Sequence, residues 1–315
     1  MKSLINLAFS TVLLIAPLSA RAVIERTVSD SFPVQAGGTL KVETFSGGIH
    51  VQSAAGSTVK VEIREKIDAS SEAEADELLK KLALSRESHG VDVSIVAKYD
   101  GENHGFHMSW GHWWPPVQLE ITVTVPENYN VDLATSGGGI SVGDLRGLIL
   151  TRTSGGALKF GKITGEIKGK TSGGGIFLES CSGKADLNTS GGSIRVGTLS
   201  GPAQLHTSGG GIAIKSAVGP LSAHTSGGSI DVGFSGPLTG DCDLVTSGGG
   251  IRVEIDAKSN FNLDAKTSAG SVKCSLPITM DHADGERSRI EGKVGTGGPL
   301  LKLRSSAGSI HVTST

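Results

Sequence analysis

The residues best suited to bind a ligand gather in one short segment, between residues 99 and 116. It holds all three tryptophans and three of the nine histidines: Trp110, Trp113, Trp114, His104, His107 and His112. Exposed aromatic rings stack on sugars or dock partner proteins, and such sites collect in loops. The histidines are weak candidates for metal ligands, because no acidic or Cys ligand stands at a familiar spacing. A third interpretation is structural: the rings cover the end of a hydrophobic core.

Acidic residues are spread through the second half of the chain: Asp186, Asp231, Asp243, Glu254 and Asp264. An enzyme that cleaves polysaccharides needs two carboxylates at a defined separation. These residues fall at different positions of the repeat described below, so the sequence predicts no catalytic residue. Asp241 and Asp243 flank Cys242, share one face of a strand, and predict a small patch of solvated acidic charge.

His206 and His224 occupy the same place, the last position, in two adjacent copies of that repeat. They are expected to face outward one repeat apart, where a histidine pair senses pH or binds a metal weakly. The same column holds Arg152, Lys170 and Asn188. These polar neighbours favour the interpretation that the column is part of an ordinary polar face.

One phrase organises the chain that carries these residues: T-S-G-G-G-I, which begins at Thr135 and recurs with variants. The repeats start at Thr135, Thr153, Thr171, Thr189, Thr207, Thr225, Thr246, Thr267 and Ser305. The first five intervals share one 18-residue period, the next two are 21, and the last is 38. A fixed period of this length is typical of a solenoid.

Two apolar columns follow each threonine, at the sixth and eighth positions of the repeat. They define a short strand with an inward face, and apolar residues at positions fifteen and seventeen define a second. Alternation then places the next threonine inward, where its hydroxyl bonds another threonine or the Ser-Gly-Gly backbone. The thirteenth position is glycine in every full 18-residue repeat, which predicts a turn with positive φ or a close backbone approach. The sequence therefore predicts an all-β fold, a single-stranded β-solenoid (β-helix) with 18-residue rungs over residues 135–315.

Residues 23–134 predict an N-terminal β-rich cap region with one helix and the Trp/His-rich loop. Strands are expected over residues 23–28, 39–45, 58–67, 91–97 and 117–125, and residues 46–51 resemble a degenerate rung. The helix is expected from Ser71 to Leu84, with Ser71 and Glu74 as a capping box. Its apolar stripe would be Ala75, Leu78, Leu79 and Leu82.

Residues 1–22 are interpreted as a signal peptide: a lysine, an apolar run from Leu4 to Leu18, and a cleavage motif ending at Ala22. No later apolar stretch is long enough to span a bilayer. The formal net charge of −2 gives no indication of nucleic-acid binding. The three cysteines fall at apolar positions of the repeat, which favours buried thiols over a Cys242–Cys274 bridge.

After Pro277 the register breaks, and residues 281–289 predict a polar loop. Ser305 to Val312 supply a last strand with no cap behind it. An uncapped solenoid end exposes an edge strand, which permits end-to-end self-association.

Three segments together resemble a known family. They are S-E-A-E-A-D-E-L-L-K-K-L, L-E-I-T-V-T-V-P-E-N-Y-N-V-D-L-A-T-S-G-G-G-I-S-V-G-D-L-R-G and the closing L-K-L-R-S-S-A-G-S-I-H-V. The chain is similar to the bacterial putative-adhesin family of β-solenoid domains of unknown function. The resemblance implies a right-handed solenoid at the cell envelope or beyond it.

The predicted function is that of a non-catalytic exported envelope protein, an adhesin-like binding or scaffolding module without cofactors. The expected partner is a protein or glycan, contacted by Trp110, Trp113 and Trp114 in the periplasm, at the cell surface or outside the cell. The alternative is a β-helical carbohydrate-active enzyme that acts on polysaccharide. Calcium-dependent folding is disfavoured because the glycine turns lack carboxylates.

Overall fold

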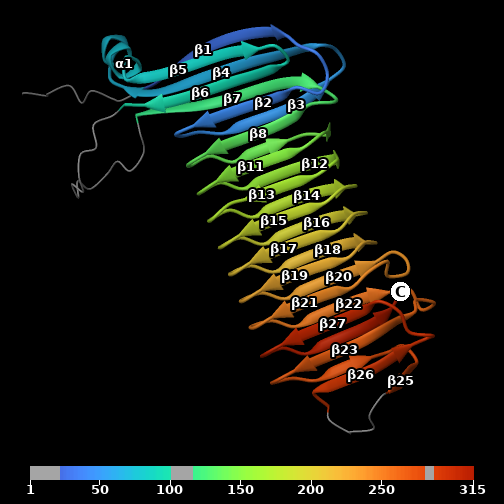
Figure 1. The fold of residues 1–315 in the computed structure, drawn as a ribbon. Coiled ribbons are helices and arrows are strands. Elements are labelled where there is room, and N and C mark those ends of the chain that lie inside the picture. The colour runs from blue at the N-terminus through green and yellow to red at the C-terminus, as the bar shows by residue number, and fades with distance from the viewer. Residues whose placement is uncertain (1–21, 101–115, 281–286) are drawn as a thin grey trace, which may run out of the picture.

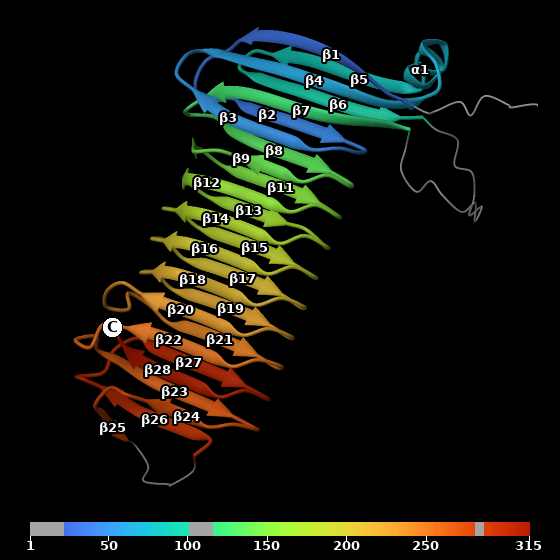
Figure 2. The ribbon, with the colours of Figure 1, turned by 180° about the vertical axis from the view of Figure 1, so that it is seen from behind.

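A computed structural model describes residues 22–100, 116–280 and 287–315 of the chain. Across these residues 28 strands form two 14-stranded sheets, sheet A and sheet B, which face each other along an elongated stack (Figures 1 and 2). The predicted signal peptide lies outside the described residues, apart from Ala22. No helix of the described segments is long and apolar enough to cross a membrane.

The strands of sheet A are, in spatial order, β1 (Ala22–Pro33), β4 (Thr58–Ala69), β7 (Val117–Pro126), β3 (Ile49–Ala54), β9 (Ile140–Val142), β12 (Leu158–Thr164), β14 (Ile176–Cys181), β16 (Ile194–Leu199), β18 (Ile212–Ala217), β20 (Ile230–Phe234), β22 (Ile251–Ile255), β28 (Ile310–Ser314) and β24 (Val272–Cys274), and β10 (Leu145–Arg146) pairs with β12. The strands of sheet B are, in spatial order, β5 (Leu82–His89), β6 (Asp92–Tyr99), β2 (Thr39–Thr44), β8 (Asn130–Thr135), β11 (Ile149–Thr153), β13 (Ile167–Lys170), β15 (Ala185–Thr189), β17 (Ala203–Thr207), β19 (Leu221–Thr225), β21 (Cys242–Thr246), β27 (Leu300–Ser305), β23 (Phe261–Thr267), β26 (Arg289–Val294) and β25 (Ile278–Met280).

Each repeat gives one strand to sheet A and one to sheet B, and neighbouring repeats pair in parallel. In sheet B, Ile149 pairs with Ile167, and Ile167 pairs with Ala185. The partners stand one full period apart in the chain, as the repeat predicts. The predicted apolar columns are buried between the two sheets, apart from the half-buried Cys274, which confirms the inward faces.

The recurring threonines are buried, and each links the corner backbone of the preceding repeat to the corner of its own repeat. Thr207 Oγ1 donates to Gly192 O at 2.7 Å and accepts from Gly210 N at 3.3 Å. The same pair of bonds recurs at Thr153, Thr171, Thr189, Thr225 and Thr246. Of the two partners that the sequence left open for this hydroxyl, the structure shows the glycine backbone.

The N-terminal end replaces parallel pairing by antiparallel pairing. β4 pairs antiparallel with β1 and β7, and β5 pairs antiparallel with β6. β2 and β3 already pair in parallel with β8 and β9, so the degenerate rung belongs to the stack.

The helix α1 (Glu72–Leu79) begins where the sequence predicts it. Ser71 Oγ accepts from Glu74 N at 3.2 Å, while the Glu74 carboxylate turns back to Ser70 N at 2.8 Å. Its predicted end is wrong, because the helix stops at Leu79 and Leu82 opens strand β5. Eight residues of β5 pair with β6, and this ladder replaces a further turn of helix.

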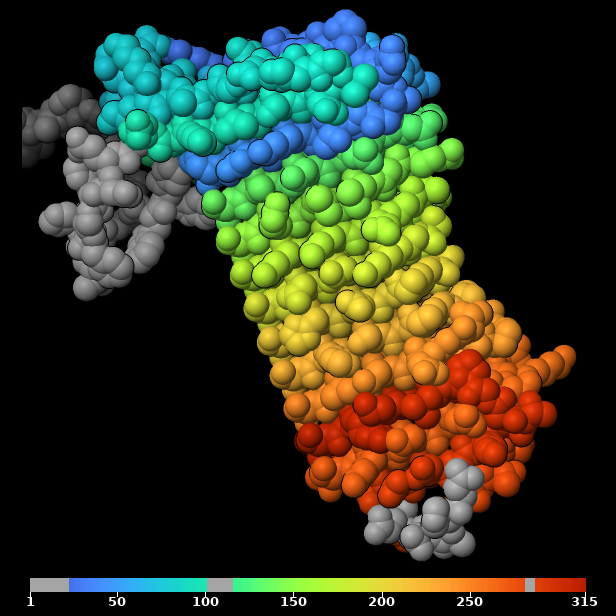
Figure 3. All heavy atoms as spheres, in the orientation of Figure 1, coloured from blue at the N-terminus to red at the C-terminus, as the bar shows by residue number. Residues whose placement is uncertain are grey.

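At the other end the spatial order of the strands departs from the chain order. β27 lies between β21 and β23, and β28 lies between β22 and β24. Figure 3 shows this C-terminal segment as a red band between orange layers. The predicted position of the last strand at an uncapped end is therefore wrong. The sheet B side of that end carries the antiparallel strands β26 and β25 instead.

All three cysteines are free thiols, so the Cys242–Cys274 bridge does not form. Cys181 and Cys242 are buried, as predicted, whereas Cys274 is only half-buried. Burial raises the pKa of the Cys242 thiol to about 11. The cysteines act as apolar side chains of the core.

Candidate functional site

The predicted aromatic and histidine site, with Trp110, Trp113, Trp114, His104, His107 and His112, lies outside the described residues. The strands before and after it are described: β6 pairs with β2 and β7 pairs with β3, both in parallel, and a short Ser-Gly-Gly corner joins β2 to β3.

A ring pair lies at the base of this segment. Tyr99 stacks on Phe45, with ring centroids 5.4 Å apart. Phe45 lies in the corner between β2 and β3, and Tyr99 ends β6. The ring contact therefore joins the end of β6 to the neighbouring corner of the stack.

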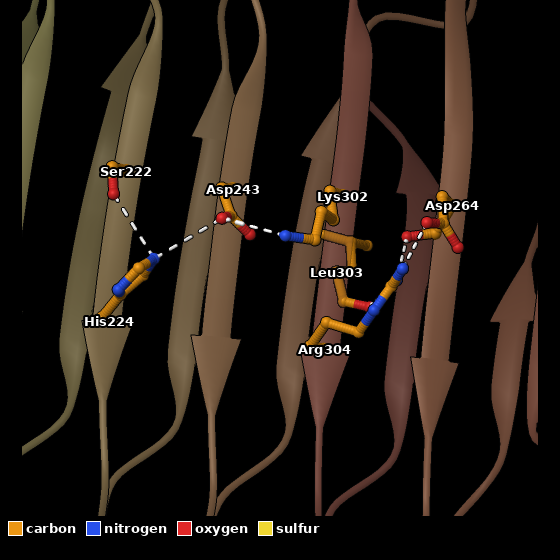
Figure 4. A network of polar contacts seen from close by, with 7 residues as sticks. All are labelled: Ser222, His224, Asp243, Asp264, Lys302, Leu303 and Arg304. Carbon is orange, nitrogen blue, oxygen red and sulfur yellow. Dashed lines mark hydrogen bonds and ion pairs between the residues drawn. The ribbon is translucent and has the colours of Figure 1, made fainter.

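A polar network covers the outward side of sheet B at the inserted C-terminal strand (Figure 4). Asp243 lies at its centre: its Oδ2 atom is 3.3 Å from Lys302 Nζ and 3.8 Å from His224 Nε2. The same histidine nitrogen lies 3.4 Å from Ser222 Oγ. Four residues from three neighbouring strands thus share one polar cluster.

Arg304 forms the second half of the network. Its Nη1 atom donates to the backbone oxygens of Asp264 at 2.8 Å and Leu303 at 3.0 Å, and its Nη2 atom contacts the Asp264 carboxylate. The two side chains are 30% and 23% exposed, so this ion pair is shielded better than most on the surface. One carboxylate oxygen of Asp264 and one of Asp243 are buried without a hydrogen-bond partner.

Strand register explains why these residues meet. Ser222, Asp243, Lys302 and Asp264 occupy one row across four neighbouring strands. Insertion of β27 therefore places a lysine between two aspartates that the sequence analysis treated as scattered.

The prediction of a solvated acidic patch at Asp241 and Asp243 is corrected by these contacts. Asp243 is paired with cations, and Asp241 Oδ1 accepts from Leu300 N at 2.8 Å. Sequence reasoning missed Lys302 and Arg304 as partners. The long interval before Ser305 signals an insertion, but it does not say between which strands the last repeat docks.

A shallow hollow of about 330 Å³ borders this network. Pro202, Pro220 and Leu300 give it apolar walls, while Asp243 and Lys302 give it a charged edge. Such a surface can hold a group with one apolar and one polar side.

The predicted histidine column is confirmed. His206 pairs with His224, and Arg152, Lys170 and Asn188 continue the same column on the preceding strands. Within the described ranges no three His, Cys, Asp or Glu side chains gather closely enough to hold a metal ion.

The remaining predicted carboxylates stay apart. Asp231 and Glu254 lie on sheet A, and Asp231 pairs with Arg252 at 3.2 Å. Asp186 lies on sheet B, 3.8 Å from Lys168.

Comparison with known proteins places the chain in a structural context. The model of one family, Toastrack DUF4097, matches residues 53–313. Among curated proteins, none matches.

Several solved structures are similar to the chain over most of its length. They include a putative lipid binding protein from Parabacteroides distasonis ATCC 8503 (15% identity, TM-score 0.45, 92% of this chain and 96% of the other), a putative adhesin from Bacteroides fragilis NCTC 9343 (12%, 0.41, 92% and 97%) and a putative adhesin from Parabacteroides merdae ATCC 43184 (11%, 0.36, 92% and 96%). At these identities and scores the similarity carries no argument about function.

Proposed function

Because the chain belongs to the Toastrack DUF4097 family, whose function is unknown, we propose its role from its own surface: a non-catalytic, adhesin-like binding or scaffolding module. In this proposal the signal peptide of residues 1–22 exports the protein to the cell envelope. Residues 23–134 form the N-terminal region, and residues 135–315 form a right-handed β-solenoid with 18-residue rungs.

The observation that carries the proposal is the register of the outward side chains. On sheet B, the column that begins at Arg152 and Lys170 continues through His206 and His224 on successive strands. Neighbouring strands are about 4.8 Å apart, so an extended ligand meets a polar side chain at each step. Long, flat repeat faces of this kind suit extended contacts.

The tryptophans of the corner segment are proposed as further contacts. Trp110, Trp113 and Trp114 fall in the sequence between β6 and β7, whereas the neighbouring strands β2 and β3 are joined by four residues. Insertions in repeat proteins map to loops on one face, which is often the binding face.

The alternative function, a carbohydrate-active enzyme, would rely on Asp243 and Asp264. They lie two strands apart, at about 10 Å, close to the upper limit for an inverting glycosidase. One of the pair must carry a proton to act as general acid. Lys302 and Arg304 instead hold the two carboxylates by ionic contacts. Binding without hydrolysis is therefore the better proposal.

The test is sedimentation of the mature protein with isolated cell-envelope fragments, combined with an assay for new reducing ends. We expect the protein to co-sediment and to release no sugar. Replacing all three tryptophans by alanine should weaken co-sedimentation at an unchanged melting temperature. Failure of the wild type to co-sediment would refute the binding role. Release of reducing ends that is lost in Asp243→Asn would establish the enzyme instead.

A further inference from the structure

The outward side of sheet A carries an aromatic ring in an unusual setting. Phe177, on β14, is 50% exposed. Its direct cross-strand neighbours are Lys159 on β12 and Arg195 on β16. A single exposed apolar side chain is ordinary, but here two cations stand on either side of the ring.

Neither cation is neutralised. Among the described residues, Lys159 and Arg195 have no ion-pair partner, and no cation–ring contact covers Phe177. Both long side chains are therefore available to a ligand that reaches the ring.

The surrounding surface is basic and open. Lys162 and Lys215 are exposed on β12 and β18, and Glu179, the acidic residue beside Phe177, is held by Lys162 at 3.6 Å. Asp144 adds a second carboxylate, since its Oδ1 atom accepts from Lys162 N at 2.8 Å. Four cations and two carboxylates give a local charge of +2, on a chain whose formal net charge is −2.

The next column is low on one side of the ring. Gly197, two positions after Arg195, has no side chain, whereas the Asp144 carboxylate lies over Gly161, two positions after Lys159. Ala213 is the small neighbour of Arg195 on the following strand. On the Arg195 side the ring therefore borders a low, flat surface rather than a pocket.

We propose that Phe177, Lys159 and Arg195 form a binding site for an acidic polysaccharide. The proposal deepens the binding function inferred above and names its ligand class. A sugar ring stacks its apolar face on Phe177, and carboxylate groups on the neighbouring sugars bind Lys159 and Arg195. The two cations lie two strands apart, about 10 Å along the stack, so the glycan runs parallel to the long axis.

A single-stranded nucleic acid is the competing ligand for a basic surface with an aromatic ring. Proteins that bind such strands present successive aromatic side chains along a positively charged groove. Here one ring stands on a flat face, which favours the polysaccharide.

The test is isothermal titration of the mature protein with a uronic-acid oligosaccharide at low salt. The comparison ligands are the same oligosaccharide with its carboxyl groups reduced to alcohols, and a short oligothymidylate. We expect the reduced sugar to bind at least about 10-fold more weakly, a loss of about 1.4 kcal/mol. The oligothymidylate should bind more weakly than the acidic sugar.

Two variants locate the site. Phe177→Ala and the double variant Lys159→Gln/Arg195→Gln should each weaken binding of the acidic sugar by about 10-fold or more, whereas Phe177→Trp should retain it. The matched control is Lys266→Gln/Lys293→Gln, which removes two exposed charges from β23 and β26 of sheet B and should change the affinity less than about 2-fold. Melting curves confirm that each variant is folded.

The proposal is overturned if the wild type does not bind the acidic sugar, or if Phe177→Ala binds as well as the wild type. It is equally overturned if the sheet B control loses as much affinity as the sheet A variant, or if the oligothymidylate binds more tightly. A protein that co-sediments with envelope fragments but fails these titrations retains the proposed function and loses only this site.

Discussion

The middle of the stack and its two ends are held together in different ways. In the middle, from β11 to β19, each strand pairs with the strand one period further on, and every corner makes the same backbone contacts. At the ends particular side chains join distant parts of the chain: Arg304 binds Asp264, 40 residues away, at the C-terminal end, and Arg86 binds Asp30, 56 residues away, at the N-terminal end. In the middle of the stack the polar side chains are aligned in columns, one on each strand. At the inserted strand β27, oppositely charged side chains lie together in one cluster.

The largest effect is expected from a methyl group in a regular corner. A Cβ on Gly210 would lie 2.3 Å from Gly192 O and 2.5 Å from Gly192 C, both backbone atoms of the preceding repeat. Since neither backbone can move without breaking the stack, we expect Gly210→Ala to cost at least about 3 kcal/mol. Chemical denaturation followed by circular dichroism measures the loss.

The irregular corner between β20 and β21 supplies the control. A Cβ on Gly236 meets no atom within 4 Å. Gly236→Ala should change stability by less than about 1 kcal/mol, in either direction. Equal losses in the two variants would mean that the regular corners are no tighter than the irregular one.

The same contrast explains how far the sequence predicts the fold. The repeat period predicts the apolar columns, the inward threonines and the close corners, because the same residue types recur at the same positions of each repeat. The place of β27 does not follow, since Thr246 fits against Ser305 as well as against Thr267 in the same two columns. Strand β5 was missed because Ser85 to His89 are exposed and show no alternation of apolar and polar residues.

The candidate site shows the same limit. The histidine column could be predicted because its residues are one period apart. The contacts of Asp243 and Asp264 could not, because Lys302 and Arg304 arrive on a segment outside the period. The period also gives the position of Phe177 on its strand. Its exposure indicates a binding site only because two unpaired cations, Lys159 and Arg195, lie beside it.

A smaller effect is expected from the ion pair at the inserted strand. Arg304→Gln removes the cation from a carboxylate that is 23% exposed, and two backbone oxygens lose their donor. We expect a loss of about 1–2 kcal/mol in the free energy of unfolding.

The regular part of sheet B offers the matching substitution. Arg152 is 67% exposed and stands 3.6 Å from Asp132. Arg152→Gln should therefore change stability by less than about 0.5 kcal/mol. If both variants lose the same free energy of unfolding, the Arg304–Asp264 ion pair does not stabilise the inserted strand. Backbone contacts alone would then hold β27 in place.

The smallest effect is expected in the N-terminal region, where one carboxylate is buried. Glu65 is 7% exposed, and burial raises its pKa above the ordinary value, although the charges of Arg26 and Arg86 oppose this rise. A carboxyl group with a raised pKa in the folded state binds its proton more tightly there than in the unfolded chain. Its contribution to stability is therefore complete below the unfolded pKa of about 4.3 and declines as the pH rises through the folded pKa.

Glu65→Gln stays neutral at every pH and escapes this decline. Relative to the wild type, the variant should thus gain stability between pH 4 and pH 7, by less than about 1 kcal/mol. Denaturation at both pH values measures the gain, and Glu62→Gln, at an exposed position of the same strand, controls for the loss of one negative charge. If Glu65→Gln instead becomes less stable relative to the wild type as the pH rises, the two arginines outweigh burial. The N-terminal end would then be held by charge pairing, as the C-terminal end is.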